Sequence, residues 1–116
     1  MYSFDDAIFL LIDKFPMLGS VYKEYEYLYK DSQFVFYGVE FIRYIIDVAN
    51  QRNTKELQTI FDFVEDMLVN GDETTQNLIE VEIVERLFLK QDEPDIEELK
   101  LYFGKLTMKS YKECFE

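Results

Sequence analysis

The sequence predicts an all-α domain, and three observations support this prediction. Apolar side chains recur at the 3.6-residue period of an amphipathic helix along nearly the whole chain. The four glycines are isolated and lie where those periodic stretches end. With 116 residues, of which 48% are hydrophobic and 17% aromatic, the chain can form one packed core. We therefore expect a single domain over residues 1–116 with about six or seven antiparallel helices.

The first half of the chain is expected to hold three helices. One apolar stripe covers residues 4–15 and ends at Pro16, and a second covers residues 18–29. The segment 33–38, QFVFYG, is richer in strand-forming residues, so we interpret it as a link. A third helix is expected over residues 39–50.

The stretch 78–88, LIEVEIVERLF, poses a choice between strand and helix. Its middle alternates apolar and acidic residues as a half-buried strand would. The alternation breaks at Ile83 and Val84, and the run continues without turn residues. We therefore expect a helix over residues 74–90.

Within this helix the three glutamates have different predicted directions. Glu82 and Glu85 fall opposite the apolar arc, so we expect them to face solvent. Glu80 falls inside the arc, where an unpaired carboxylate is costly. It would either be a buried functional carboxylate or lie at the margin and reach solvent or a basic side chain such as Arg43.

Cap signals bound the remaining helices of the second half. Ser, Thr, Asp and Asn favour helix starts, and glycine favours helix ends. The signals are Thr54 and Gly71 for the fourth helix, Asp95 with Glu98 and then Gly104 for the sixth, and Thr107 for the start of the last.

A weak internal repeat favours a stack of helix pairs. A shift of 20 residues aligns residues 62–73 with residues 82–93. A helix plus a turn has about this length in α-solenoids. Helical patterning alone produces part of such a match, so the repeat serves only to favour a HEAT-like stack over a closed bundle.

The chain is strongly acidic, and the charge is uneven. It has 24 acidic and 12 basic residues, a net charge of −12. Between Asp62 and Glu98 there are 13 acidic residues against two basic ones. Such a surface repels phosphate backbones and anionic membranes and attracts basic proteins. We expect a protein partner with a basic surface, and neither nucleic acid nor membrane.

The residue inventory excludes many reaction types. Histidine is absent, which excludes Ser-His-Asp triads, Cys-His pairs and the common zinc motifs. No glycine-rich phosphate loop or EF-hand loop is present. The single cysteine, Cys114, cannot form an intrachain disulfide, and the start, MYSFDDAIFLLIDKF, lacks the pattern of a signal peptide. We expect no catalytic residues, no metal, no cofactor and a cytoplasmic location.

Paired carboxylates are the remaining candidates for a functional surface. Asp62 with Asp66, and Glu82 with Glu85, each lie within one helical turn. They could serve acid–base chemistry or hold a cation, but a solvated face that binds a basic protein is favoured. An outward Tyr27, beside lysines, is a candidate interface anchor. The predicted partner-binding residues are Asp62, Asp66, Asp72, Glu73, Glu82, Glu85 and Tyr27.

Three stretches carry a resemblance to a known group of proteins. They are FDDAIFLLIDKFP (4–16), VFYGVEFI (35–42) and IFDFVEDMLVNGDETTQNLIEVEIVERLF (60–88). They resemble the small helical, HEAT-like immunity proteins that accompany bacterial polymorphic and contact-dependent growth-inhibition toxins. The resemblance implies a cognate toxin that is neutralised by tight binding, and the acidity suggests that this toxin is a basic nuclease.

Two other functions are compatible with the residues. An acidic adaptor or antirepressor could use the same surface to occlude a DNA-binding protein. A carboxylate-dependent hydrolase would need a deep pocket in which two carboxylates converge.

Overall fold

The computed structural model describes residues 1–89 and 96–116, and the regular structure in these residues is helical apart from one isolated β-bridge. This confirms the all-α fold. No helix in the described ranges is long and apolar enough to cross a bilayer. The elements are η1 (Phe4–Asp6), α1 (Ala7–Lys14), α2 (Pro16–Glu24), α3 (Glu26–Tyr29), α4 (Gln33–Phe36), η2 (Tyr37–Phe41), α5 (Ile42–Asn50), α6 (Thr54–Asn70), α7 (Glu73–Ile79), η3 (Glu80–Glu85), α8 (Arg86–Leu89), α9 (Ile96–Leu99), η4 (Lys100–Tyr102) and α10 (Lys105–Phe115).

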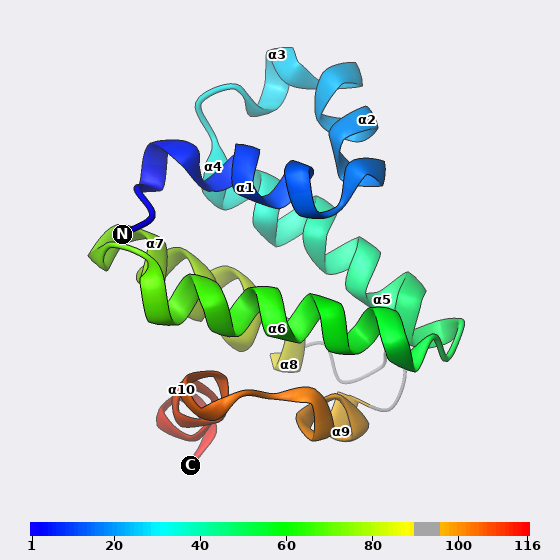
Figure 1. Cartoon of the computed structure of the whole chain (residues 1–116), viewed down its shortest axis with the longest axis vertical. Coiled ribbons are helices and arrows are strands. Elements are labelled where there is room, and N and C mark those ends of the chain that lie inside the picture. Colours follow the sequence, from blue (N-terminus) through cyan, green and yellow to red (C-terminus); the bar gives the residue numbers. More distant parts are fainter. Residues whose placement is uncertain (90–95) are drawn as a thin grey trace.

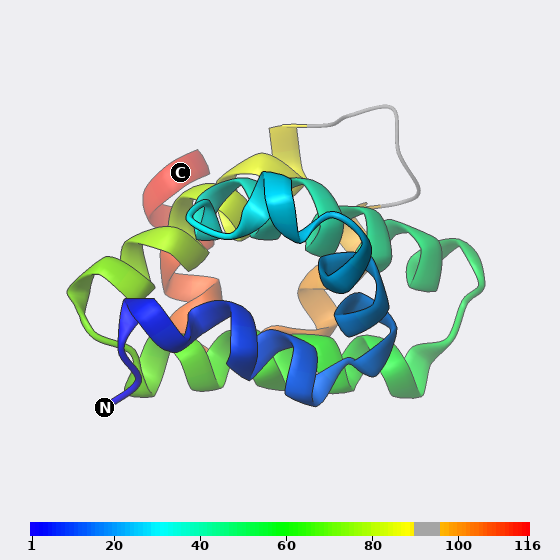
Figure 2. The same cartoon turned by 90° about the horizontal axis from the view of Figure 1, so that it is seen from above.

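Helix α6 is the centre of the arrangement (Figure 1). It packs against α5, α7 and α10. Helices α1, α2 and α3 lie at one end of the long axis, and α9 and α10 lie at the other (Figure 1). Seen from above, α6 runs along one side of the molecule and the continuous α4–η2–α5 helix along the other (Figure 2).

Aromatic rings form the middle of the core. The ring of Phe41 lies 5.6 Å from that of Phe15, 5.8 Å from that of Tyr37 and 5.9 Å from that of Phe63, measured between centroids. All four side chains are buried. Full burial of such a side chain contributes about 1.5–3 kcal/mol. Phe15 follows α1, Tyr37 and Phe41 lie on η2, and Phe63 lies on α6, so this cluster stabilises the packing of three segments.

The interpretation of residues 33–38 as a link is wrong. They form α4 and the start of η2, and run without a break into α5. Phe36 and Tyr37 are completely buried, and Tyr37 donates a hydrogen bond to the carbonyl of Ala7 (2.7 Å). Packing against α1 therefore outweighs the strand preference of these residues.

Two of the predicted helix boundaries are correct, one predicted helix is divided, and two predicted caps are displaced. Pro16 follows the end of α1, and Gly71 caps the end of α6. The predicted helix over residues 18–29 is divided at Tyr25, and the described residues hold eight continuous helical segments where about six or seven are expected. Asn53, and not Thr54, caps α6 through its side chain, and Gly104 precedes α10 in place of Thr107. The Asp95 part of the predicted capping pair lies outside the described residues.

Thr107 is buried, where it binds a carboxylate of α6. Its backbone N–H donates to Oε1 of Glu65, as does its hydroxyl, both at 2.9 Å. The N–H of Leu106 donates to the other oxygen of Glu65 at 2.9 Å. Glu65 therefore satisfies N–H groups in the first turn of α10 that have no partner within the helix, and it docks α10 onto α6.

Candidate functional site

The predicted partner-binding residues do not form one continuous face. Asp62, Glu73 and Glu85 are exposed, as expected. They lie on α6, at the start of α7 and at the end of η3, respectively. Two acidic regions result: a groove between α1 and α6, and a surface formed by η3 and α10.

Glu82 is buried, so its expected outward direction is wrong. Its side chain packs against Gly38 of η2 and accepts a hydrogen bond from Nε of Arg86 at 2.8 Å. The physical cause is that η3 is π-helical. One inserted residue rotates the side chains that follow by about 100° relative to an α-helix, and Val81 is exposed instead.

The groove between α1 and α6, here the α1–α6 groove, contains about 230 Å³ of space. Its floor is apolar, and Asp13, Lys14 and Asp66 are its charged residues. Asp62 lies one turn from Asp66 on the same helix. Sequence reasoning missed Asp13, although its place beside the apolar stripe of residues 4–15 indicated an exposed carboxylate. The lining residues are Tyr2, Leu10, Asp13, Lys14, Phe63, Asp66 and Met67.

Asp66 already accepts two hydrogen bonds within the protein. The hydroxyl of Tyr2 donates to Oδ2 at 2.8 Å, and the side-chain amide of Asn70 donates to Oδ1 at 2.6 Å. The bond to Asp66 is the main cause that raises the pKa of Tyr2. A carboxylate has about four acceptor positions, so Asp66 is held in place and can still accept from a partner.

Asp72 has a structural role, because both of its carboxylate oxygens accept hydrogen bonds from the backbone. Its Oδ1 accepts from the backbone N–H of Thr75 at 2.8 Å, which caps α7, and its Oδ2 accepts from the N–H of Phe4 at 3.0 Å. The hydrogen bonds from Thr75, followed by that from Phe4, lower the pKa of Asp72. Asp72 therefore connects the start of the chain to the turn between α6 and α7.

Glu80 and Glu113 belong to the η3–α10 surface, which also includes Glu85. Glu80 is half-buried and shares a pocket of about 280 Å³ with Lys109 and Glu113. Burial, followed by the charge of Glu113, raises the pKa of Glu80. The predicted alternative partner, Arg43, instead contacts Glu40 at 3.0 Å.

Glu40 is a second buried carboxylate on a π-helical segment. Its position opposite the apolar stripe of residues 39–50 predicts exposure, yet it is only 6% exposed. The hydroxyl of Tyr29 donates to it at 2.7 Å, and Arg43 donates at 3.0 Å. Burial and the bond to Glu40 raise the pKa of Tyr29 to about 12. Glu40 therefore holds α3 onto η2 and is unavailable to a partner.

Tyr27 is 78% exposed, so the outward direction predicted for it is confirmed. It lies on α3, at the end of the molecule opposite α10 (Figure 1). Tyr27 is therefore remote from the η3–α10 surface.

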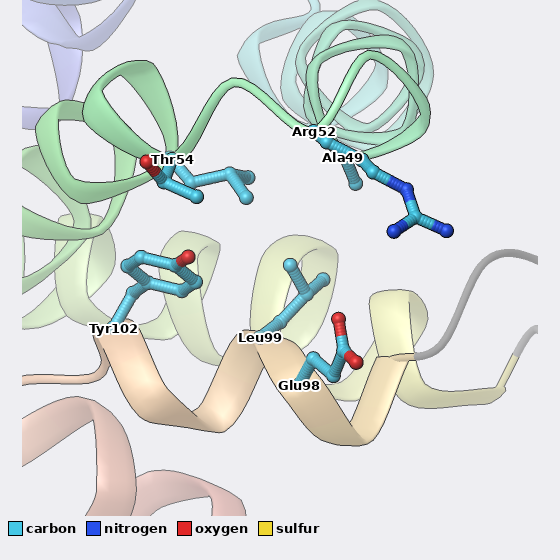
Figure 3. A pocket seen from close by; sticks show the side chains of 7 residues that line it. Ala49, Arg52, Thr54, Glu98, Leu99 and Tyr102 are labelled. Atoms are coloured by element: carbon cyan, nitrogen blue, oxygen red, sulfur yellow. The ribbon is translucent and has the colours of Figure 1, made fainter.

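A further pocket of about 200 Å³, here the corner pocket, lies between the α5–α6 turn and α9 (Figure 3). Arg52 in this turn has φ 55°, the only positive φ among the described non-glycine residues. This left-handed conformation costs an arginine about 1 kcal/mol. The lining residues are Ala49, Arg52, Thr54, Leu57, Glu98, Leu99 and Tyr102.

The chemistry of these groups favours recognition by charge. Within the described residues, no group of three His, Cys, Asp or Glu side chains is arranged to hold a metal ion. Of the paired carboxylates, Glu82 is engaged by Arg86, Asp66 lines the α1–α6 groove, and Asp62 is exposed one turn away on the same helix. Burial, followed by the charges of Glu85, Glu80 and Glu113, raises the pKa of the Cys114 thiol, which disfavours the reactive thiolate.

The fold and these surfaces define an acidic all-α domain. Residues 8–116 match the family described as a domain of unknown function, DUF7674, and the chain belongs to this family. No curated protein and no solved structure matches the chain. The family description states no activity or partner, so the resemblance to immunity proteins and the HEAT-like comparison remain predictions.

Proposed function

We propose that this domain is a cytoplasmic immunity protein that binds and neutralises a cognate toxin with a basic surface, such as a nuclease. It acts by covering the surface with which the toxin binds its substrate, and not by catalysis. The resemblance in the three quoted stretches and the net charge of −12 both support this proposal.

The observation that carries the proposal is a set of exposed or half-buried carboxylates that take part in no ion pair within the described residues. Within the described residues, the ion pairs are Glu40–Arg43, Glu82–Arg86 and Glu97–Lys100. The carboxylates of both acidic regions are absent from these pairs, so their field extends into solvent and steers a cationic protein towards them. The carboxylates of the two regions are Asp13, Asp62, Asp66, Glu80, Glu85 and Glu113, and the exposed Glu73 at the start of α7 is likewise outside the ion pairs.

The α1–α6 groove is the best-suited contact point for a lysine or arginine of the toxin. Leu10, Phe63 and Met67 offer apolar contact for the aliphatic stem. Asp13 and Asp66 offer acceptors for the charged head. Lys14 weakens the field at one edge of the groove and would favour an approach from the side of Asp62.

The test begins with co-expression of the domain and the product of the neighbouring reading frame. A stoichiometric complex and protection of the host from that product are the expected results. The association rate should fall by about tenfold or more from low to high salt, because exposed charges are screened. A rate indifferent to salt would contradict acidic steering.

Matched variants distinguish the contribution of the α1–α6 groove to association from that of the overall negative charge. Asp13→Asn, Asp62→Asn and Asp66→Asn together should slow association much more than Glu24→Gln, Glu26→Gln and Asp31→Asn. Both triple variants remove the same charge, and the control residues are exposed on or beside α2 and α3. Equal effects would remove the groove from the interface. Recovery of a DNA-binding regulator in place of a toxin would favour the adaptor function.

A further inference from the structure

The corner pocket has an apolar interior and two opposite charges at its mouth. Leu57 and Leu99 line the interior and are buried. Arg52 extends from the upper wall and Glu98 from the lower wall, towards the same end of the pocket (Figure 3). The binding of a basic protein at the α1–α6 groove requires none of these residues.

The two charges are available to a ligand. Arg52 and Glu98 are both exposed, and no ion pair between them occurs among the contacts of the described residues. The backbone of Arg52 lies in the left-handed region, at φ 55°, where glycine or asparagine is favoured. A long cationic side chain therefore occupies a position whose backbone disfavours it, which makes the guanidinium a candidate functional group.

The walls are tied together, so the pocket is largely preformed. The side-chain amide of Gln58 on α6 donates to the carbonyl of Tyr102 on η4 at 3.3 Å. Buried Leu99 anchors α9 in the core. At the end away from the charges, Tyr102 lies beneath Thr54, so these two side chains border that end of the pocket (Figure 3). Preformed pockets bind small ligands with little ordering cost.

We propose that the corner pocket binds a small zwitterion, namely a free amino acid with an apolar side chain. The guanidinium of Arg52 binds the carboxylate, Glu98 binds the ammonium group, and the side chain packs between Leu57 and Leu99. The space of about 200 Å³ is below the range of about 300–1,000 Å³ typical of sites for drug-sized ligands, which favours a ligand as small as an amino acid. A simple anion would be repelled by Glu98, and a simple cation by Arg52.

The test is an NMR titration of the intact domain with L-leucine as the probe. We expect saturable shifts of the amide signals of Leu57 and Leu99. Leucine amide, which lacks the carboxylate, and N-acetyl-leucine, which lacks the ammonium group, should each bind at least about tenfold more weakly, because each loses a charge-assisted hydrogen bond. Equal binding of the capped forms, or no saturable shift with L-leucine, would overturn the proposal.

Variants of the two charged residues give an independent readout. Arg52→Gly should retain or raise the unfolding temperature, because glycine accepts the left-handed backbone, while it weakens L-leucine binding at least about tenfold. Glu98→Gln should weaken binding similarly. The controls are Lys55→Gln and Glu97→Gln, which remove neighbouring exposed charges that do not line the pocket. Affinity unchanged in Arg52→Gly, or reduced equally in the controls, would refute the assignment.

Discussion

The carboxylate of Glu82 lies directly against Gly38, where η3 crosses η2. A β-carbon at Gly38 would overlap Oε2 of Glu82 and lie 3.0 Å from its Cδ and 3.1 Å from Nε of Arg86. Both residues lie on π-helical segments that contact each other. The close approach therefore depends on the absence of a side chain at position 38. It lets the buried carboxylate of Glu82 lie between two helices while its partner Arg86 reaches the surface.

Gly38→Ala should lower the free energy of unfolding by about 1–2 kcal/mol. Overpacking costs about 1–3 kcal/mol, and the better helix propensity of alanine offsets part of this. The control is Gly19→Ala in α2, where the nearest atom to an added β-carbon is Cβ of Ile12 at 3.7 Å. This control should gain about 0.5–1 kcal/mol. Urea unfolding measures both, and a stabilising Gly38→Ala would contradict the packing.

Glu65→Ala should lower the free energy of unfolding by about 2–3 kcal/mol, because hydrogen bonds to charged groups contribute about 1.5–3 kcal/mol. Glu65 accepts three such bonds from the first turn of α10. Hydrogen exchange should accelerate most in α10. Asp62→Ala, on the same helix, should change stability by no more than about 0.5 kcal/mol, and equal losses in both variants would refute the role of Glu65.

Asp72 should stabilise the fold in a pH-dependent way. Its pKa is lowered in the folded protein from the ordinary value of 3.8, because Thr75 and Phe4 donate to the ionised form. The contribution is therefore present above pH 3.8 and is lost as the pH falls through the lower folded pKa. Asp72→Asn should be less stable than the wild type at neutral pH, and the difference should shrink in stronger acid. A difference independent of pH would show that charge is not involved.

Glu80 should have the opposite effect. Burial and Glu113 raise its pKa above the ordinary value of 4.5, so the folded state binds the proton more tightly. Stability then falls as the pH rises from 4.5 through the raised pKa. Glu80→Gln should be more stable than the wild type at neutral pH and similar to it below pH 4.5. Thermal unfolding across this pH range is the measurement, with Glu24→Gln as an exposed control, and a destabilised Glu80→Gln at neutral pH would refute the expectation.

Helix boundaries show how far local sequence reasoning extends. Pro16 and Gly71 act through their own backbone chemistry, and both lie where predicted. Residue type predicts Thr54 and Thr107 as helix caps, but Asn53 and Gly104 hold these cap positions. Thr107 instead binds Glu65, which is 42 residues earlier in the chain. Cap preferences depend on residues close in sequence, so they do not predict a partner this far along the chain.

The sequence by itself determined the all-α class, the acidity and the absence of histidine chemistry, because periodicity and composition do not depend on which helices become neighbours. Only the tertiary structure decided which carboxylates face solvent. Because η3 is π-helical, Glu82 is buried and Val81 is exposed, the reverse of what an α-helix predicts. Helix α3 covers Glu40, whose carboxylate accepts a hydrogen bond from Tyr29. The direction of a side chain depends on accumulated helical phase and on the element packed over it. Both are set when distant segments meet, as they do around the α1–α6 groove and the corner pocket.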